Sequence, residues 1–379
     1  MPLLALPLQT VHTVSGFVTL ASSSVALLEA ARLYLRKRES ATRPVFSDPE
    51  PEARVSVDEL AVELEQEPAI AAVAAEASPE GVEAARVSLV CNGDLEPDEP
   101  ASPVASFVVT ASGVSDRGKK RRTNEDCLLL LHDHALFVVA DGMGGYNGGE
   151  VASSLAVDAI REAFERKSFD ADLRCDVPLP VRGRELAAAL HEANRVVSDL
   201  ASEQAELASM GTTLVAARFS ATRQSVYIAN VGDSRCYRFR AGKLAQLTTD
   251  HTLSQLGDRG PARNQLYRAI GVKPVVDIDI LVDSAQPEDV YLLCSDGLPK
   301  MVSAADIAAA LASQPDLELA AHDLVERAND AGGSDNVTVV LMRVRERGAA
   351  AYQPGAVGHP TTRQAHEPAR RAAEGTEQS

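Results

Sequence analysis

The sequence predicts an α+β domain in which sheets pack together and helices lie outside them. Short runs rich in β-branched and aromatic residues stand apart from longer stretches of helical periodicity, and the two kinds occur in separate blocks. The chain has 379 residues, but its composition changes so strongly along its length that only one stretch is expected to bury a core.

The expected strands follow one another as short apolar or β-branched runs. They lie at 107–109, 127–131, 136–140, 213–219, 226–231, 236–240, 278–282, 290–294 and 337–344. Apolar residues at helical spacing predict helices at 148–166, 184–206, 304–313 and 317–331. These elements together define one expected folded domain, residues 106–347.

The segments on either side of this domain differ from it in composition. Residues 1–38 begin with an uncharged apolar run and end in a basic cluster, and their hydropathy is marginal for a membrane span of about 20 residues. A membrane anchor, a surface-lying arm and an unstructured arm all remain open for them. Residues 39–105 are rich in Ala, Glu, Pro and Ser and predict a disordered acidic linker. Residues 348–379 predict a disordered tail.

The net charge of -17 is unevenly distributed along the chain. Between Asp48 and Glu99, fifteen acidic residues stand against two basic ones, so the remainder is only mildly acidic. No long Lys/Arg stripe of the kind that binds a phosphate backbone occurs, which argues against a nucleic-acid partner. The five cysteines form no CxxC pair or Cys/His cluster. This pattern fits free thiols in a reducing compartment and predicts a cytoplasmic protein.

Acidic residues stand where expected strands stop or start: Asp126, Asp141, Asp233, Asp296 and Asp335. A carboxylate at the end of a buried apolar run is costly to desolvate unless a cation compensates for it. One Asp-Gly pair is an ordinary turn, but several such carboxylates favour a metal site. Oxygen ligands favour Mg²⁺ or Mn²⁺ over Zn²⁺. Two such ions, about 3.5–4 Å apart, can activate a water for phosphoester hydrolysis.

Arg121 lies in the basic run 119–122, shortly before Asp126. A planar guanidinium can hold two phosphate oxygens at once, so Arg121 is the candidate phosphate clamp; a solvated basic turn is the alternative. The glycine-rich stretch 142–149 lacks the GKS or GKT of a phosphate-binding loop, which argues against an ATPase. No thiolate loop is evident, which argues against a cysteine phosphatase.

In this order, the motifs resemble the protein phosphatase 2C family, the PPM class, in its bacterial form. The resemblance extends over about 240 residues. Its blocks are SDRG at 115–118, NED at 124–126, DGMGG at 141–145, GTT at 211–213, NVGDSR at 230–235, TDH at 249–251, RAIG at 268–271, CSDGL at 294–298 and GGSDNVT at 332–338.

The resemblance implies an α-β-β-α sandwich of two antiparallel sheets flanked by helices. It also implies metal-dependent hydrolysis of phosphoserine and phosphothreonine in proteins, opposing a bacterial serine/threonine kinase. Two alternatives stay open: a phosphoprotein-binding or partner-switching module, and a phosphatase of small molecules. Retention of all five aspartates favours the protein phosphatase over the binding module.

The resemblance also implies a set of ligands for two Mn²⁺ or Mg²⁺ ions. Asp141 is implied as the bridge between the two ions, with Asp126 and the Gly142 carbonyl completing one ion and Asp296 and Asp335 holding the other. Asp233 is implied to share a third, weaker ion with Asp296. Glu125 is implied to act through water, and Arg121 to bind the substrate phosphate.

Three features depart from the family pattern or vary within it. Tyr146 stands where many bacterial members carry a histidine, and a phenol with a pKa of about 10 is a poorer acid at neutral pH. The Pro299-Lys300 pair after CSDGL is less usual. The segment 253–267 corresponds to a flap expected to shape substrate choice.

Overall fold

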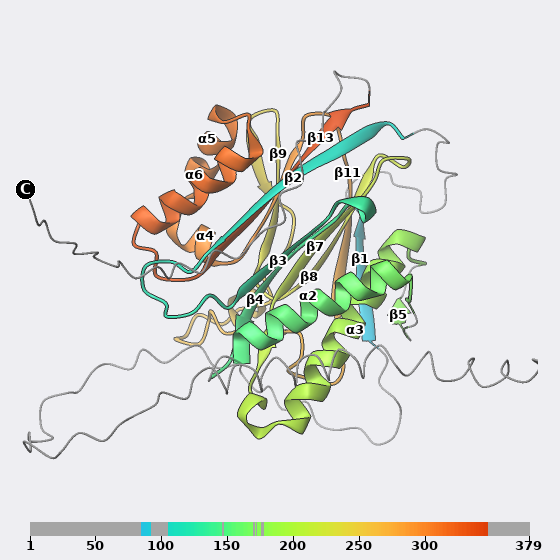
Figure 1. Cartoon of the computed structure of the whole chain (residues 1–379), viewed down its shortest axis with the longest axis vertical. Coiled ribbons are helices and arrows are strands. Elements are labelled where there is room, and N and C mark those ends of the chain that lie inside the picture. The colour runs from blue at the N-terminus through green and yellow to red at the C-terminus, as the bar shows by residue number, and fades with distance from the viewer. Residues whose placement is uncertain are drawn as a thin grey trace, which may run out of the picture. The chain divides into compact units, whose positions relative to one another are not determined.

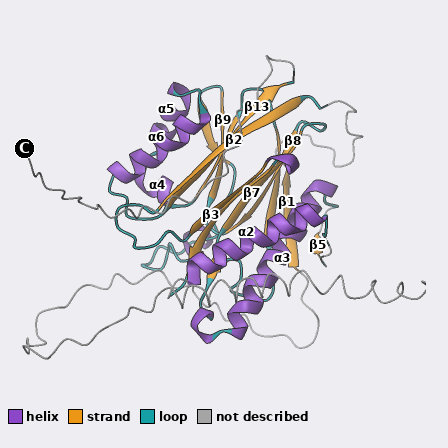
Figure 2. Cartoon of the chain, in the orientation of Figure 1, coloured by secondary structure: helices purple, strands orange, loops and turns teal. Residues whose placement is uncertain are grey.

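The computed structural model describes residues 85–91, 105–145, 148–169, 171, 173–175 and 178–347. Two β-sheets pack together in this part of the chain, and helices cover their outer faces (Figure 1). Figure 2 shows the helices as two groups, one on either side of the strands. The predicted α+β sandwich is confirmed.

The larger sheet has eight strands. Its order is β3 (Asp126–Leu131), β4 (Leu136–Met143), β7 (Leu214–Ser220), β8 (Ser225–Val231), β11 (Ile278–Ser284), β1 (Ala85–Cys91) and β5 (Leu173–Cys175), with β6 (Gly211–Thr212) beside β4. Neighbours from β3 to β11 are antiparallel, whereas β1 runs parallel to both β11 and β5.

The smaller sheet has five antiparallel strands. Its order is β10 (Lys243–Gln246), β9 (Arg235–Arg240), β12 (Val290–Cys294), β13 (Val337–Glu346) and β2 (Phe107–Asp116). β2 is longer than the expected 107–109 because it pairs with β13 along its whole length. Ser, Thr and Gly residues interrupt the apolar pattern in the rest of β2, so the sequence did not predict the full length of this strand.

Five helices flank the sheets in the described ranges: α2 (Gly148–Arg166), α3 (Val181–Glu203), α4 (Gly297–Met301), α5 (Ala304–Ser313) and α6 (Leu317–Asp330). α2 and α3 pack on the larger sheet and the other three on the smaller one. Side-chain caps mark two of the predicted starts, because Ser303 accepts from the Asp306 N–H and Asp316 accepts from the Glu318 N–H. No helix among the described residues is long and apolar enough to cross a bilayer.

Strand β4 shows how the layers are held together. Val138 and Ala140 face α2 and α3, while the alternate residues Phe137 and Val139 face the smaller sheet. A strand buried on both faces must be apolar at every position, which explains the continuous run LFVVA. Burial of each large side chain contributes about 1.5–3 kcal/mol, so the strand ends that carry the aspartates are rigidly placed.

Strand β1 was not expected. Residues 85–91 fall within 39–105, predicted to be a disordered linker, and for them that prediction is wrong. Val87 is almost completely buried, and parallel pairing with β11 supplies backbone hydrogen bonds that an isolated acidic segment lacks. Residues 1–38, most of 39–105 and 348–379 lie outside the described residues.

Candidate metal centre and active site

The antiparallel strands place the predicted acidic residues at one end of both sheets. Asp126 opens β3 and is the direct partner of Asp141 in β4. In the smaller sheet, Cys294 at the end of β12 pairs with both Arg235 and Val339. The connections that carry Asp233, Asp296 and Asp335 therefore leave or enter their strands at a common end.

Asp126 is half-buried and only partly hydrogen bonded. Its Oδ2 accepts a hydrogen bond from Ser295 Oγ at 2.8 Å, whereas its buried Oδ1 has no hydrogen-bond partner. Burial, together with the smaller effect of the Asp296 and Asp335 carboxylates, raises the pKa of Asp126 to about 7 against the hydrogen bonds that lower it. A buried carboxylate oxygen without a donor fits a position for a cation.

Asp141 is held by its main chain while its carboxylate lies among other acids. Its N–H donates to Thr213 Oγ1 at 3.2 Å, and its carbonyl accepts from Thr212 Oγ1 at 2.8 Å. Burial raises the pKa of Asp141 well above its usual value, and the nearest acidic neighbour in this effect is Asp126. Asp296, Asp233 and Asp335 act on it in the same direction, which indicates that all five predicted aspartates share one site.

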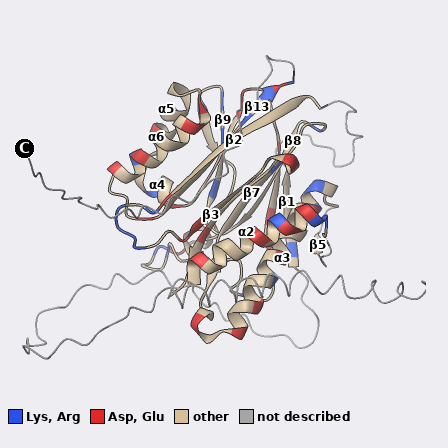
Figure 3. Cartoon of the chain, viewed as in Figure 1, with Lys and Arg blue, Asp and Glu red and all other residues tan. Residues whose placement is uncertain are grey.

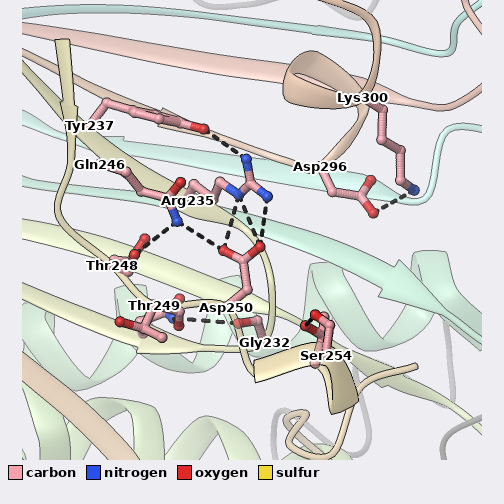
Figure 4. A network of polar contacts seen from close by, with 12 residues as sticks. Gly232, Arg235, Tyr237, Gln246, Thr248, Thr249, Asp250, Ser254, Asp296 and Lys300 are labelled. Atoms are coloured by element: carbon pink, nitrogen blue, oxygen red, sulfur yellow. Dashed lines mark hydrogen bonds and ion pairs between the residues drawn. The ribbon is translucent and has the colours of Figure 1, made fainter. Parts of the chain in front are cut away.

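Asp296 and Asp335 already hold cationic side chains. Lys300 Nζ lies 2.5 Å from Asp296 Oδ2 (Figure 4). It also lies 3.1 Å from Asp335 Oδ2. Arg121 Nε lies 3.0 Å from Asp335 Oδ1. Burial raises the pKa of Asp296 and Lys300 lowers it, and the Oδ1 atom of Asp296 is buried without a hydrogen-bond partner.

Arg121 is placed by the loop between β2 and β3, where basic residues gather in Figure 3. Asn336 fastens this loop, because its Nδ2 donates to the carbonyls of Arg117 and Thr123 at 2.8 and 2.9 Å. Its Oδ1 accepts from the Glu125 N–H at 2.9 Å. The start of β13 therefore positions both Asp335 and the arginine that contacts it.

Gly142 and Gly149 bring the start of α2 against β4. A Cβ on Gly142 would lie 2.0 Å from the Gly149 carbonyl oxygen, so only glycine fits. The Gly142 N–H donates to the Glu125 carbonyl at 3.1 Å, and Ser153 Oγ donates to the same oxygen at 2.6 Å. These hydrogen bonds hold Glu125 beside Gly142, and both residues were predicted to belong to the metal site.

Asp233 lies in the turn between β8 and β9. Burial raises its pKa to about 7, with Asp296 as its strongest acidic neighbour. The turn is supported by the Gly232 N–H, which donates to His251 Nδ1 at 3.0 Å, and by Arg235, which pairs with both carboxylate oxygens of Asp250 (Figure 4). These contacts hold the turn that carries Asp233, and the effect of Asp296 on its pKa indicates that the two carboxylates are neighbours.

The expected flap, 253–267, contains only a short 3₁₀ turn, Leu253–Leu256, and an isolated bridge between Thr252 and Leu266. Tyr146 lies outside the described residues. Lys300 is the site residue to which sequence reasoning assigned no role. Its spacing of four residues from Asp296 in a short helix was the available signal.

The donor set fits hard divalent cations. All side-chain donors are carboxylates, which suit Mg²⁺ and Mn²⁺, and Asp126 and Asp296 each offer a buried oxygen without a hydrogen-bond partner. No three Asp, Glu, His or Cys side chains in the described ranges form a ready-made metal cage.

Comparison with known proteins agrees with this geometry. A family model described as protein phosphatase 2C matches residues 117–340. The serine/threonine phosphatase Stp of Listeria welshimeri is 37% identical over 242 residues, which cover 60% of this chain and 93% of that protein. The protein phosphatase PhpP of Streptococcus pneumoniae is 32% identical over 250 residues, which cover 62% of this chain and 98% of that protein.

Solved structures show the same fold. The serine/threonine phosphatase PstP/Ppp of Mycobacterium tuberculosis matches with a TM-score of 0.55 and 34% identity, covering 63% of this chain and all of that one. A structure of the PstP catalytic domain in complex with two manganese ions matches with a TM-score of 0.55 and 35% identity, covering 64% of this chain and 100% of that one. The chain belongs to the protein phosphatase 2C family and is a metal-dependent protein phosphatase of the bacterial type.

Proposed function

We propose that this chain hydrolyses phosphoserine and phosphothreonine in proteins at the site where its five aspartates meet. The observation that carries the proposal is that two carboxylate oxygens at this site, Asp126 Oδ1 and Asp296 Oδ1, are buried without a hydrogen-bond partner. Such oxygens are costly in a metal-free protein and become favourable contacts once a divalent cation is bound.

The proposed ligands divide between the two sheets. Asp141 would be shared by two ions; Asp126 and the Gly142 carbonyl would hold one, and Asp296 and Asp335 would hold the other. Asp233 together with Asp296 would hold a third, weaker ion, and Glu125 would act through water. The mutual effects of these acids on the pKa of Asp141 support a single shared site. Mn²⁺ and Mg²⁺ both suit the oxygen donors.

Bound divalent cations supply positive charge for the phosphoryl oxygens and lower the pKa of water. Arg121 binds the substrate phosphate. Its Nε contact with Asp335 Oδ1 orients the guanidinium, whose planar shape allows paired contacts with phosphate oxygens. Asn336 keeps the Arg121 loop in place, so the phosphate ligand and the proposed metal ligands share one rigid support.

The proposed substrates are phosphorylated proteins, including targets of a serine/threonine kinase or the kinase itself. Stp and PstP carry serine/threonine phosphatase in their names, which supports this substrate class. We place the catalytic domain at residues 106–347 and add strand β1, because β1 extends the larger sheet through β11.

The decisive experiment measures phosphate release from a phosphothreonine peptide by the full chain with Mn²⁺, with Mg²⁺ and with EDTA. Hydrolysis should require a divalent ion. Asp141→Asn should lower kcat by about 100-fold or more while the protein stays folded, since it removes charge but little volume. Asp323→Asn, on the exposed face of α6, is the matched control and should retain full activity. Metal-dependent turnover of Asp141→Asn at the wild-type rate would rule out the proposed site.

A further inference from the structure

Lys300 occupies the place between two proposed ligands of one metal ion. It lies one helical turn after Asp296, in α4, so its side chain returns toward the residue that precedes the helix. Its Nζ contacts Asp296 Oδ2 and Asp335 Oδ2 at 2.5 and 3.1 Å. Figure 4 shows the ammonium directed at the Asp296 carboxylate.

The charges of Asp296 and Asp335 are balanced by two cationic side chains. Asp335 receives Lys300 on one carboxylate oxygen and Arg121 on the other. Asp296 receives Lys300 on Oδ2, and its Oδ1 is buried without a hydrogen-bond partner. Two carboxylates and two cationic side chains thus form a neutral cluster, in which the ammonium holds the acids together against their mutual repulsion.

An ammonium and a divalent cation cannot both occupy this position. Both oxygens of Asp335 are already paired, Oδ2 with Lys300 and Oδ1 with Arg121. An ion held jointly by Asp296 and Asp335 would therefore lie beside the Lys300 ammonium, even if it bound Asp296 through the unpartnered Oδ1. The lysine has room to leave, because its side chain is 48% exposed and ends a flexible four-carbon stem. Withdrawal therefore needs rotation of the side chain and no movement of α4.

We propose that Lys300 is a tethered competitor for the metal ion held by Asp296 and Asp335: it neutralises this pair in the metal-free protein and must withdraw before the ion binds. The inference rests on the proposed placement of that ion. Its consequence is unequal metal affinity. The ion at Asp126 and Asp141 meets no competing side chain among the contacts described there, whereas the other ion must displace an ion pair.

The test is a titration of the full, metal-stripped chain with Mn²⁺, followed by calorimetry and by the electron paramagnetic resonance signal of free Mn²⁺. Lys300→Met keeps the stem and removes the charge, and Lys300→Gln does so with a remaining N–H donor. Lys300→Arg keeps the charge. Arg327→Met is the matched control, because it removes an exposed (i,i+4) ion pair with Asp323 on the neighbouring α6.

In Lys300→Met and Lys300→Gln, the Mn²⁺ affinity of the weaker class of sites should rise by about 10-fold or more. The affinity of the tighter class should stay unchanged. Lys300→Arg and Arg327→Met should keep the wild-type isotherm. In EDTA, Lys300→Met should melt below the wild type, since Asp296 and Asp335 then repel each other with only the Arg121 contact to Asp335 remaining among the described ion pairs. Saturating Mn²⁺ should remove this difference.

Suppose that the wild-type chain binds Mn²⁺ and hydrolyses the phosphopeptide while the Mn²⁺ isotherms of Lys300→Met and Lys300→Gln superimpose on its own. That result would overturn the proposed role of Lys300 and leave the proposed function standing. Wild-type protein that binds no Mn²⁺ would instead overturn the proposed function. If only one of the two neutral variants folds, the isotherm of that folded variant decides between these outcomes.

Discussion

Asp126 and Asp141 are direct cross-strand partners on β3 and β4, and their carboxylates are buried on the same face of the sheet. Side chains of such partners lie about 4.5–5.5 Å apart at Cβ, where like charges destabilise the sheet. The fold therefore carries a local electrostatic cost at the position where a divalent cation is proposed to bridge two carboxylates.

This cost predicts how the stability of the metal-free protein depends on pH. The pKa of Asp126 is raised from 3.8 to about 7 in the folded chain, mainly by burial. Between these values the folded state holds a proton that the unfolded state has released. Stability is therefore lost as pH rises through this window, by about 1.4 kcal/mol for each unit of the shift.

Urea unfolding in EDTA at about pH 5 and about pH 7.5 measures this effect. Relative to the wild type, the free energy of unfolding of Asp126→Asn should be larger at the higher pH than at the lower one, because the amide has no proton to lose. Asp323→Asn, at an exposed site, serves as the control. A difference between Asp126→Asn and the wild type that is independent of pH would contradict the raised pKa of Asp126.

Arg121→Ala should act mainly on substrate binding. Because Arg121 is proposed to hold the phosphate in both the ground state and the transition state, its loss should raise KM by about 10-fold, with a smaller fall in kcat. Arg122→Ala, in the same loop, is the matched control. Steady-state kinetics on a phosphothreonine peptide measure both constants, and an unchanged KM for Arg121→Ala would remove Arg121 from the phosphate site.

Gly142→Ala should disturb the site through the backbone. The added Cβ would meet the Gly149 carbonyl oxygen at 2.0 Å, and neither backbone segment can move without displacing β4 or α2. We expect a loss of about 1–3 kcal/mol in the free energy of unfolding, together with weaker Mn²⁺ binding. Gly145→Ala is a close control, since nothing lies within 4 Å of its added Cβ. Equal stability of the two variants would show that the contact at Gly142 is not tight.

Strand β1 should contribute to the stability of the catalytic domain. Val87→Ala removes two methyl groups from a side chain that is only 1% exposed, and should lower the free energy of unfolding by about 1–2 kcal/mol. Val90→Ala, at a residue that is 52% exposed, should change it by less than about 0.5 kcal/mol. Urea unfolding of the full chain measures both. Equal effects of the two substitutions would indicate that β1 does not pack on β11 in solution.

Local patterns were sufficient for most elements of the two sheets. The run at 290–294 predicted β12 and the periodicity at 148–166 predicted α2, each with the observed bounds. Both patterns are strong because these elements are buried against a neighbouring layer. β1 escaped prediction because its order comes from pairing with β11, which is far away in sequence.

The sequence by itself determined the family, the two-sheet architecture and the identity of the acidic residues, because motifs, apolar periodicity and carboxylates at strand ends are all local features. Their roles as metal ligands remain a proposal. Only the tertiary structure decided which cationic side chain contacts which carboxylate. Lys300 meets Asp335, and Asn336 fastens the Arg121 loop, through contacts between distant segments that the packing of β12 and β13 brings together. Such contacts depend on the relative placement of strands, and no local pattern encodes that placement.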